Sequence, residues 1–533
     1  MKNGLRQSMA WLHTWSGLLL GWLLFAIFLT GTVAYFRQEI TVWMQPETHH
    51  SIPGPDSAAI GMEKLAEIAP EAETWSISLP NERGNTLDVG WRNPDDPPGR
   101  RGGHRETLDA GTGDVIDARE TAGGNFLYRF HFELHALPRN WARWIVGVAT
   151  FFMFIAIISG IITHKRIFKD FFTFRPRKGQ RSWLDMHNVT AVMALPFHLM
   201  ITYSGLLLFM STIMPFAVEG RHRGPPPDRG EAAIVEVQRD ARPLTDVTPL
   251  LQKARTEWGQ AVGRITIYEP SSPDAMIELA PLRNHDLTSH SGSGSNGVER
   301  MTFDGHSGEL LESTTGRRND SVVTKVNNTF GTLHRARFAD TGLRWIFFFA
   351  GVAGTVMVGT GLSLWVSKRA VKNAKAGKAS LGFRLVERLN AGSVAGLSLA
   401  VTAYFWANRL IPAGVANRAD WEINSFLIVW ALAAVYAFLR PVARAWIEIA
   451  GATAILLIGL PVLNMVVTDS HLFWSVPHGQ WIVAGFDIMA LLTGICFAYA
   501  AWVLTHRKAA PSHARKRPAE APARAVASPA EGH

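Results

Sequence analysis

Long apolar runs with few charged residues recur along this 533-residue chain, and they constrain its fold more than any other feature. A bilayer is crossed by about 20 consecutive apolar residues in a helix. The runs of sufficient length lie near residues 9–36, 144–164, 186–214, 343–366, 389–411, 423–439, 446–468 and 480–505. The sequence therefore predicts an α-helical polytopic membrane protein with about eight transmembrane helices, of which the one at 423–439 is the shortest.

The composition indicates that polar domains lie outside the membrane. Hydrophobic residues make up 47% of the chain and charged residues 18%, which favours a membrane protein. The mean hydropathy is nevertheless only +0.06, so extramembrane segments must dilute the apolar runs. The predicted boundaries are transmembrane helix 1 at 1–36, an outer domain at 37–140, helices 2 and 3 at 141–214, a second outer domain at 215–340, helix 4 at 341–366, helices 5 to 8 at 389–505 and a basic tail at 506–533.

Basic residues in the short connections predict the orientation, because Lys and Arg accumulate on the cytoplasmic side. The connection at 165–182 has seven basic residues against one Asp, and that at 367–388 has seven against one Glu. With eight spans, both connections and both termini share one side, so we expect the termini in the cytoplasm. This bias accounts for much of the net charge of +9 without a nucleic-acid partner. The first run is too long for a signal peptide and has no small-residue cleavage site after it, so we expect it to remain as an anchor.

Each outer domain is predicted to be a small α+β unit. Helical spacing of apolar residues occurs at 58–68 in the first and at 250–258 in the second. Alternating, strand-like segments are TWSISLP, NTLDVGW, RITIYEP, AMIELAP and VERMTFD. Neither domain carries a nucleophile or phosphate-loop signature, which favours binding or scaffolding modules.

The first half of the chain contains an internal repeat. His13 lies eighteen residues before Gly31, and His187 lies eighteen residues before Gly205. Further equivalent positions are Thr30 and Ser204, Leu134–His135 and Leu333–His334, Trp144–Ile145 and Trp345–Ile346, and the turns from Asp109 to Gly113 and from Asp304 to Gly308. Each unit is thus a span, an outer domain and a span, and such repeats often build a site at their interface.

Histidine is the residue type that suits a redox cofactor here. The only cysteine, Cys496, lies in the last span, which excludes an intrachain disulfide, covalent haem attachment through CxxCH and a cysteine-ligated iron–sulfur cluster. His187 and His198 are eleven residues apart, so on one straight helix they would lie about 20° from alignment and about 16 Å apart along the axis. They would then share a face, although Pro196 is expected to kink that helix.

Haem ligation is the chemistry that these histidines suit best. By the repeat, His13 and His187 are equivalent at the cytoplasmic boundary, as are His135 and His334 at the outer one, and a polar residue as deep as His198 usually faces a partner or a cofactor. A compact zinc or copper site would commonly add carboxylates or thiolates, and these spans contain few. Hydrogen bonding between helices remains the alternative, and for His164 at the end of the second span a position at the lipid headgroups is favoured. Asp487 in the last span is expected to form a polar pair with another helix, with proton handling or quinol contact as alternatives.

The segments WLHTWSGLLLG and HNVTAVMALPFHLMITYSGL, the Leu-His dipeptides before the second and fourth spans, and the two D-x-x-x-G turns resemble the PepSY-associated transmembrane helix proteins. The resemblance covers residues 1 to about 370. The last four spans, with DSHLFWSVPHGQWIVAGFDIMALL, resemble an extension found in one subset of the family. The resemblance to this family implies two PepSY-like outer domains inserted in a tandem repeat, in a bacterial inner-membrane protein.

Family members include reductases that hold b-type haems and pass electrons outward to ferric siderophores. Carried over to this chain, the resemblance implies a ferric-siderophore reductase with two haems, with His13, His187, His198, His135 and His334 as candidate axial ligands and His164 as the runner-up. Which histidines pair stays open. No G-x-G-x-x-G fingerprint opens a cytoplasmic βαβ unit, so the electron donor is expected to be another protein, a free reduced flavin or a quinol. Rival functions are a non-redox siderophore or metal transporter and a membrane-anchored periplasmic binding or regulatory module.

Overall fold

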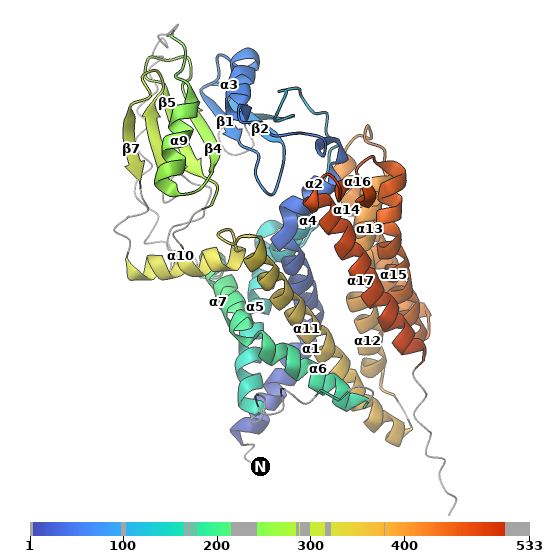
Figure 1. Cartoon of the computed structure of the whole chain (residues 1–533). Coiled ribbons are helices and arrows are strands. Elements are labelled where there is room, and N and C mark those ends of the chain that lie inside the picture. Colours follow the sequence, from blue (N-terminus) through green and yellow to red (C-terminus); the bar gives the residue numbers. More distant parts are fainter. Residues whose placement is uncertain are drawn as a thin grey trace, which may run out of the picture.

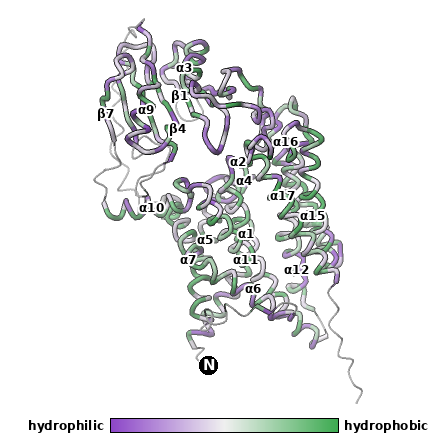
Figure 2. The backbone as a smooth tube through the Cα atoms, in the orientation of Figure 1, coloured by the Kyte–Doolittle hydropathy of each residue, from purple (hydrophilic) through white to green (hydrophobic). Residues whose placement is uncertain are grey.

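A bundle of long helices carries a sheet domain at one end (Figure 1). The computed structural model describes residues 4–97, 103–164, 168, 171, 174–175, 178–214, 242–283, 287, 299–314, 321–377 and 379–506. Hydrophobic residues concentrate on the bundle helices, whereas the sheet domain is largely polar on its outside (Figure 2). This distribution is that of a multi-pass membrane protein with an extramembrane domain.

Within the described chain, six helical segments are long and apolar enough to cross a membrane. They are Leu5–Met44, Arg139–Thr163, Thr341–Ala376, Arg418–Leu439, Val442–Val467 and Trp481–Thr505, and the bent pair Gln180–Met193 with Leu195–Leu208 makes a seventh span if it is counted as one. The eighth predicted span, at 389–411, consists of the end of α12 (Leu381–Asn390), a π-helical turn, η4 (Ala391–Ala395), and α13 (Gly396–Leu410). None of these pieces reaches the length of a span alone, so the count of eight remains a prediction.

The third predicted span is bent by 70° between α6 (Gln180–Met193) and α7 (Leu195–Leu208). Pro196 has no backbone N–H to donate to the carbonyl four residues earlier, which favours a break at this point. The expectation that His187 and His198 share a helical face is therefore wrong, because they lie on different helices that diverge.

The repeat is visible as two sets of helices. The first set is α1 (Leu5–Val33), α4 (Gly123–Glu133) and α5 (Arg139–Thr163), with η1 (Ala34–Phe36) and α2 (Arg37–Met44) continuing α1. The second set is α6 and α7, followed by α8 (Met210–Ile213), α10 (Val322–Arg335) and α11 (Thr341–Ala376). Along the chain, each set has a short helix, α4 or α10, between its strands and its second long helix.

The two predicted outer domains form one continuous antiparallel sheet. Its seven strands are β1 (Thr74–Ser78), β2 (Leu87–Arg92), β3 (His104–Leu108), β4 (Val262–Tyr268), β5 (Met276–Pro281), β6 (Arg300–Asp304) and β7 (Leu310–Thr314), in the order β3-β2-β1-β4-β5-β6-β7. β1 of the first repeat pairs with β4 of the second, with Ile77 opposite Ile265. α3 (Ser57–Ile68) and α9 (Val247–Trp258) pack against the sheet and complete one shared hydrophobic core. The sequence predicts five of these strands and both helices, but misses β3 and β7.

An ion-pair cluster joins the sheet domain to the membrane helices. Glu39 of α2 accepts hydrogen bonds at 2.8 Å from Arg83, in the β1–β2 connection, and at 2.6 Å from Arg344 at the start of α11. Arg344 is only 3% exposed, so this carboxylate is needed to balance its buried positive charge. The cluster fixes the sheet domain against both repeats.

The C-terminal helices pack against the first repeat. They comprise α12, η4 and α13, then α14 (Arg418–Leu439), α15 (Val442–Val467), the short α16 (Leu472–Ser475) and α17 (Trp481–Thr505), and we call this set the C-terminal bundle. Asp487 of α17 accepts hydrogen bonds from the indole of Trp43 at 2.9 Å and from Asn464 at 3.2 Å. The polar pairing expected for Asp487 is thus confirmed.

His49, which directly follows η2 (Pro46–Thr48), predicts a pH-dependent stability of the fold. His49 is buried, its Nε2 donates to the carbonyl of Val42 at 2.7 Å, and its Nδ1 has no hydrogen-bond partner. Burial lowers the pKa of His49 from 6.5 to about 3, against the opposing effect of the bond to Val42. The unfolded chain therefore takes up a proton as the pH falls through 6.5 while the folded chain does not, and stability is lost between pH 6.5 and about 3.

The measurement is the drop in melting temperature of the detergent-purified protein between about pH 7.5 and pH 5. We expect His49→Gln to reduce this drop, by an amount corresponding to at most about 2 kcal/mol at pH 5. Other histidines contribute equally to both proteins and cancel in the comparison. Identical pH dependence in the two proteins would contradict the buried, neutral state of His49.

Candidate functional site

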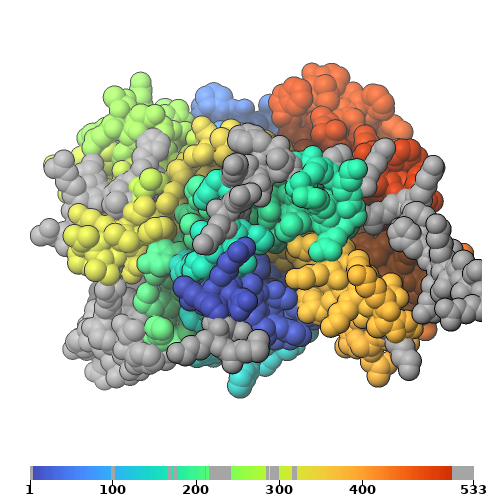
Figure 3. Space-filling model, turned by 90° about the horizontal axis from the view of Figure 1, so that it is seen from below, coloured from blue at the N-terminus to red at the C-terminus, as the bar shows by residue number. Residues whose placement is uncertain are grey.

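His13 of α1 and His187 of α6 lie together in the bundle. Their ring centroids are 6.2 Å apart, with the ring planes at 73°. Nδ1 of His13 donates to the carbonyl of Ala156 on α5 at 2.8 Å, and Nδ1 of His187 donates to the carbonyl of Met357 on α11 at 2.8 Å. α6 and the N-terminal end of α1 lie on the side of the bundle away from the sheet, which Figure 3 views directly. We call these two residues the far-side pair.

A second pair forms on the side of the sheet domain, from His131 of α4 and His334 of α10. Their ring centroids are also 6.2 Å apart, with the planes at 45°. Nδ1 of His131 donates to the carbonyl of Ile27 on α1 at 2.7 Å, and Nδ1 of His334 donates to the hydroxyl oxygen of Ser204 on α7 at 2.8 Å. Ile27 follows His13 by fourteen residues on α1, about 21 Å along a straight helix axis. We call His131 and His334 the sheet-side pair.

All four imidazoles contact a neighbouring helix in the same way. Each lies against a glycine that follows a serine or threonine, so that the ring comes close to the backbone of the neighbouring helix. A Cβ atom added at Gly31 would lie 2.5 Å from Nδ1 of His131. The corresponding contacts are 3.2 Å from Gly160 to Cε1 of His13, 3.2 Å from Gly361 to Cε1 of His187, and 3.5 Å from Gly205 to Cε1 of His334.

The hydrogen bonds determine which ring nitrogen carries the proton. A carbonyl oxygen can only accept, so Nδ1 of His13, His131 and His187 must be the protonated nitrogen. The hydroxyl of Ser204 donates to the carbonyl of Met200 at 2.7 Å, so its oxygen accepts from Nδ1 of His334. In the neutral tautomer of each ring, Nε2 then holds the free lone pair. No hydrogen bond to these four Nε2 atoms is found among the described residues.

This geometry fits a metal bound between the two rings of a pair. An imidazole nitrogen lies about 2.0 Å from a first-row metal and about 1 Å from its own ring centroid, so two axial rings on one metal have centroids about 6 Å apart. An edge-to-face ring contact has a similar separation. The protonated Nδ1 agrees with the first case, because a metal-binding histidine typically donates its other N–H to a carbonyl or hydroxyl partner.

Each pair offers two imidazole ligands. Among the residues that the structure describes, no group of three or more His, Cys, Asp or Glu side chains is placed to hold a metal ion. Two imidazoles alone leave most coordination positions of a metal to another ligand, and a porphyrin supplies four nitrogens in the plane between two axial histidines. The residues of both pairs therefore fit a haem.

The other predicted site residues belong to neither pair. His135 follows the end of α4, and its ring contacts Phe126 at a centroid distance of 5.8 Å; His131, four residues earlier, lies opposite His334 instead. His198 is 1% exposed near Phe28, and neither of its nitrogens makes a hydrogen bond of normal geometry. His164 directly follows α5 and belongs to neither pair.

The glycines at both pairs leave a signal in the sequence, whereas nothing in it selects His131 over His135. The glycines at both pairs belong to four Ser/Thr-Gly dipeptides, of which the repeat analysis used Thr30–Gly31 and Ser204–Gly205. The other two, Ser159–Gly160 and Thr360–Gly361, occupy matching places when counted from the first residues of α5 and α11. The Leu-His dipeptide shared by the repeats pointed to His135, whereas the structural equivalent of His334 is His131.

The fold and these pairs define a multi-pass helical membrane protein, built from a tandem repeat with an extramembrane sheet domain, in which histidines of one repeat meet those of the other. A family model described as "PepSY-associated TM region" matches residues 10–368, and the chain belongs to this family. The matched region contains both histidine pairs and ends before the C-terminal bundle. No curated protein matches the chain.

Proposed function

We propose that this protein carries electrons across a bacterial inner membrane through two b-type haems and reduces a ferric siderophore or another ferric chelate on the side of the sheet domain. The observation that carries the proposal is the pair of equal His–His separations, each with both Nδ1 atoms bound to a neighbouring helix. When bound, each haem supplies a one-electron carrier with two imidazole ligands.

The protein's own residues would hold and insulate these carriers. His13 and His187 would ligate one haem near the cytoplasm, and His131 and His334 would ligate the other near the periplasm. The carbonyls of Ala156, Met357 and Ile27 fix the ring orientations and increase the basicity of Nε2. The sheet domain then lies outside, in agreement with the basic connections, and the donor is a cytoplasmic protein, a reduced flavin or a quinol.

Reduction would release iron because ferrous iron binds hard oxygen ligands less tightly than ferric iron does. A haem held by His131 and His334 would supply one electron to the ferric ion of the chelate, with no atom transferred. The experiment mixes dithionite-reduced protein in nanodiscs with a ferric hydroxamate chelate under anaerobic conditions. We expect reoxidation of the visible bands with one ferrous ion trapped per electron. A haem-loaded protein that no ferric chelate reoxidises would contradict the proposal.

The 70° bend between α6 and α7 favours a second candidate, a non-redox siderophore or metal transporter. Transporters often place a broken helix and unpaired polar groups at the membrane midplane, as His198 beside this bend would supply. Liposomes with haem-free protein separate the two functions. Uptake of an iron chelate by these liposomes would support transport. No uptake by the liposomes, together with ferric reduction by the haem-loaded protein, would support the reductase.

The glycine contacts give a prediction for the sheet-side pair. Gly31→Ala places a methyl group against Nδ1 of His131, and overpacking of this kind costs about 1–3 kcal/mol, equivalent to a roughly 10- to 100-fold loss of haem affinity at that site. We expect haem content to fall towards one per chain. Gly451→Ala is the matched control, because a Cβ there meets nothing within 4 Å. Full haem retention in Gly31→Ala would show that His131 does not need this contact.

A further inference from the structure

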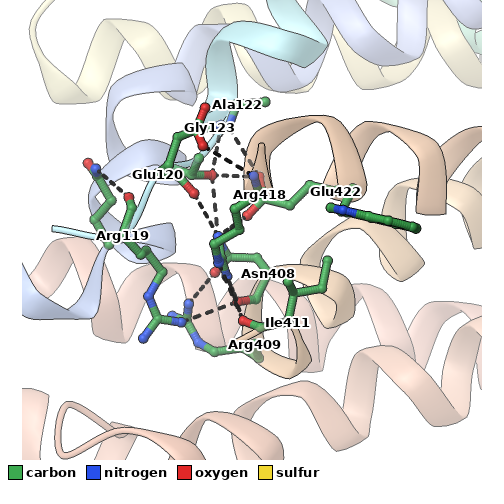
Figure 4. Close-up of polar contacts among 12 residues, drawn as sticks. Arg119, Glu120, Ala122, Gly123, Asn408, Arg409, Ile411, Arg418 and Glu422 are labelled. Carbon is green, nitrogen blue, oxygen red and sulfur yellow. Dashed lines mark hydrogen bonds and ion pairs between the residues drawn. The ribbon is translucent and has the colours of Figure 1, made fainter. Parts of the chain in front are cut away.

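The C-terminal bundle lies outside the family match at residues 10–368. It makes a group of polar contacts with the segment that begins α4 (Figure 4). Glu422 of α14 accepts hydrogen bonds from the hydroxyl of Thr121 at 2.7 Å and from the backbone N–H of Ala122 at 3.1 Å. The hydroxyl of Tyr404 donates to the carbonyl of Gly123, the first residue of α4, at 2.8 Å. The bundle thus holds the N-terminus of α4 from outside.

The bundle residues of this network are buried, whereas Thr121 and Ala122 are partly exposed, and Figure 4 shows the polar contacts between them. Arg418 and Glu422 are each 0% exposed and form an ion pair at 2.5 Å, and Asn408 donates to the same carboxylate at 2.7 Å. Arg418 also donates to the carbonyl of Glu120 at 2.8 Å. Buried ion pairs are costly to desolvate and are weak evidence for stability alone. Their geometry here instead fixes the path of residues 120–123.

Apolar contacts extend the attachment along α4. The ring centroid of Phe126 lies 5.2 Å from that of Tyr404 and 5.1 Å from that of Phe426. The ring centroid of Phe130 lies 5.3 Å from that of Phe426. His131 follows Phe130 directly and bonds to α1. α4 is therefore packed between the C-terminal bundle and the helix to which its histidine is bound.

α4 has little that would hold it in place by itself. It has eleven residues, begins with Gly123 and Gly124, and its N-cap residue, Ala122, has no capping side chain. Within its own repeat, the hydroxyls of Thr121 and Thr41 accept from the N–H groups of Gly123 and Gly124, each at 3.0 Å. Short helices with glycines are marginal without tertiary contacts. Its counterpart α10 has fourteen residues and is capped by the side chain of Ser321, which accepts from the N–H of Thr324. The asymmetry indicates that α4, and not α10, requires external support.

We propose that the C-terminal bundle is a clamp that positions α4, and with it His131, at the sheet-side pair, and that Glu422 and Tyr404 are its positioning residues. The effect on a haem rests on the proposed function, whereas the clamping of α4 does not. The clamp would fix the angle at which the imidazole of His131 approaches a metal opposite His334.

The experiment uses the full-length chain with Tyr404→Phe and Glu422→Gln. Tyr404→Phe removes one hydroxyl and keeps the ring, so it remains informative if Glu422→Gln does not fold. Glu448→Gln is the control, because Glu448 pairs with Arg440 away from α4. The first measurement is hydrogen exchange of α4 in haem-free protein. We expect exchange at 123–133 to accelerate about tenfold or more in both variants and to stay unchanged in α10 and in the control.

The second measurement is the reduction midpoint and electron paramagnetic resonance spectrum of haem-loaded protein. In a His187→Ala background, where only the sheet-side haem is expected, both variants should shift the signal. In a His334→Ala background they should leave the remaining signal unchanged. Unaltered α4 exchange in the variants would overturn the clamp. Altered exchange in a protein that never binds haem would retain the clamp and reject the proposed function instead.

Discussion

Replacing His187 with alanine will leave about one haem per chain and stop electron transfer from the cytoplasmic side to an outer ferric chelate. The reason is that His187 and His13 are the histidine pair found on the far side among the described residues, and one imidazole holds haem far less firmly than two. The measurements are the haem-to-protein ratio and the rate at which liposome-enclosed reductant reduces an external ferric chelate. The sheet-side haem should keep its spectrum, because Ile27 and Ser204 still orient His131 and His334.

His478→Ala is the control for this prediction, since His478 stacks on Trp474 in the exposed loop before α17 and touches neither pair. It should retain two haems and the full transmembrane rate. If His187→Ala also retained both haems, the far-side pair would be no more than a contact between helices, and the electron path would have to enter the protein elsewhere.

The second large effect distinguishes His131 from His135. His131→Ala is expected to abolish the sheet-side haem and reduction of the external chelate, whereas His135→Ala is expected to keep both. His131 meets the ring of His334 at 6.2 Å, while the ring of His135 lies against Phe126. The readouts are the reduced visible spectrum and the low-spin resonance of each variant.

The repeat in the sequence makes the opposite prediction, because it aligns His135 with His334. Loss of haem in His135→Ala with retention in His131→Ala would therefore contradict the structural pairing and favour the sequence alignment. Loss in both would indicate that the turn after α4 matters as much as the ligand itself.

Much of the membrane architecture is predictable because it depends on local signals. The apolar runs mark the long helices, and the eighteen-residue spacing that repeats from His13 to Gly31 and from His187 to Gly205 identifies equivalent helices. The far-side pair follows from this equivalence. The strands with clear alternation were also predictable, whereas β3, with His104, Arg105 and Glu106 among its five residues, has no apolar period.

Features that depend on distant contacts were not predictable. The pairing of β1 with β4 joins residues almost two hundred positions apart, so two domains that look separate in sequence share one sheet. Pro196 was expected to kink one helix, but the size of the bend, 70°, was not predictable, and it removes His198 from the line of His187. The attachment of Glu422 to the start of α4 likewise leaves no trace in the sequence near either residue.

We propose that each histidine pair holds one haem, and the most direct test combines the haem-to-protein ratio with the resonance spectrum of the oxidised, purified protein. We expect two haems per chain, both low-spin with two imidazole ligands, after expression with sufficient haem supply. A colourless protein, or one whose haem is high-spin with a single histidine ligand, would contradict it.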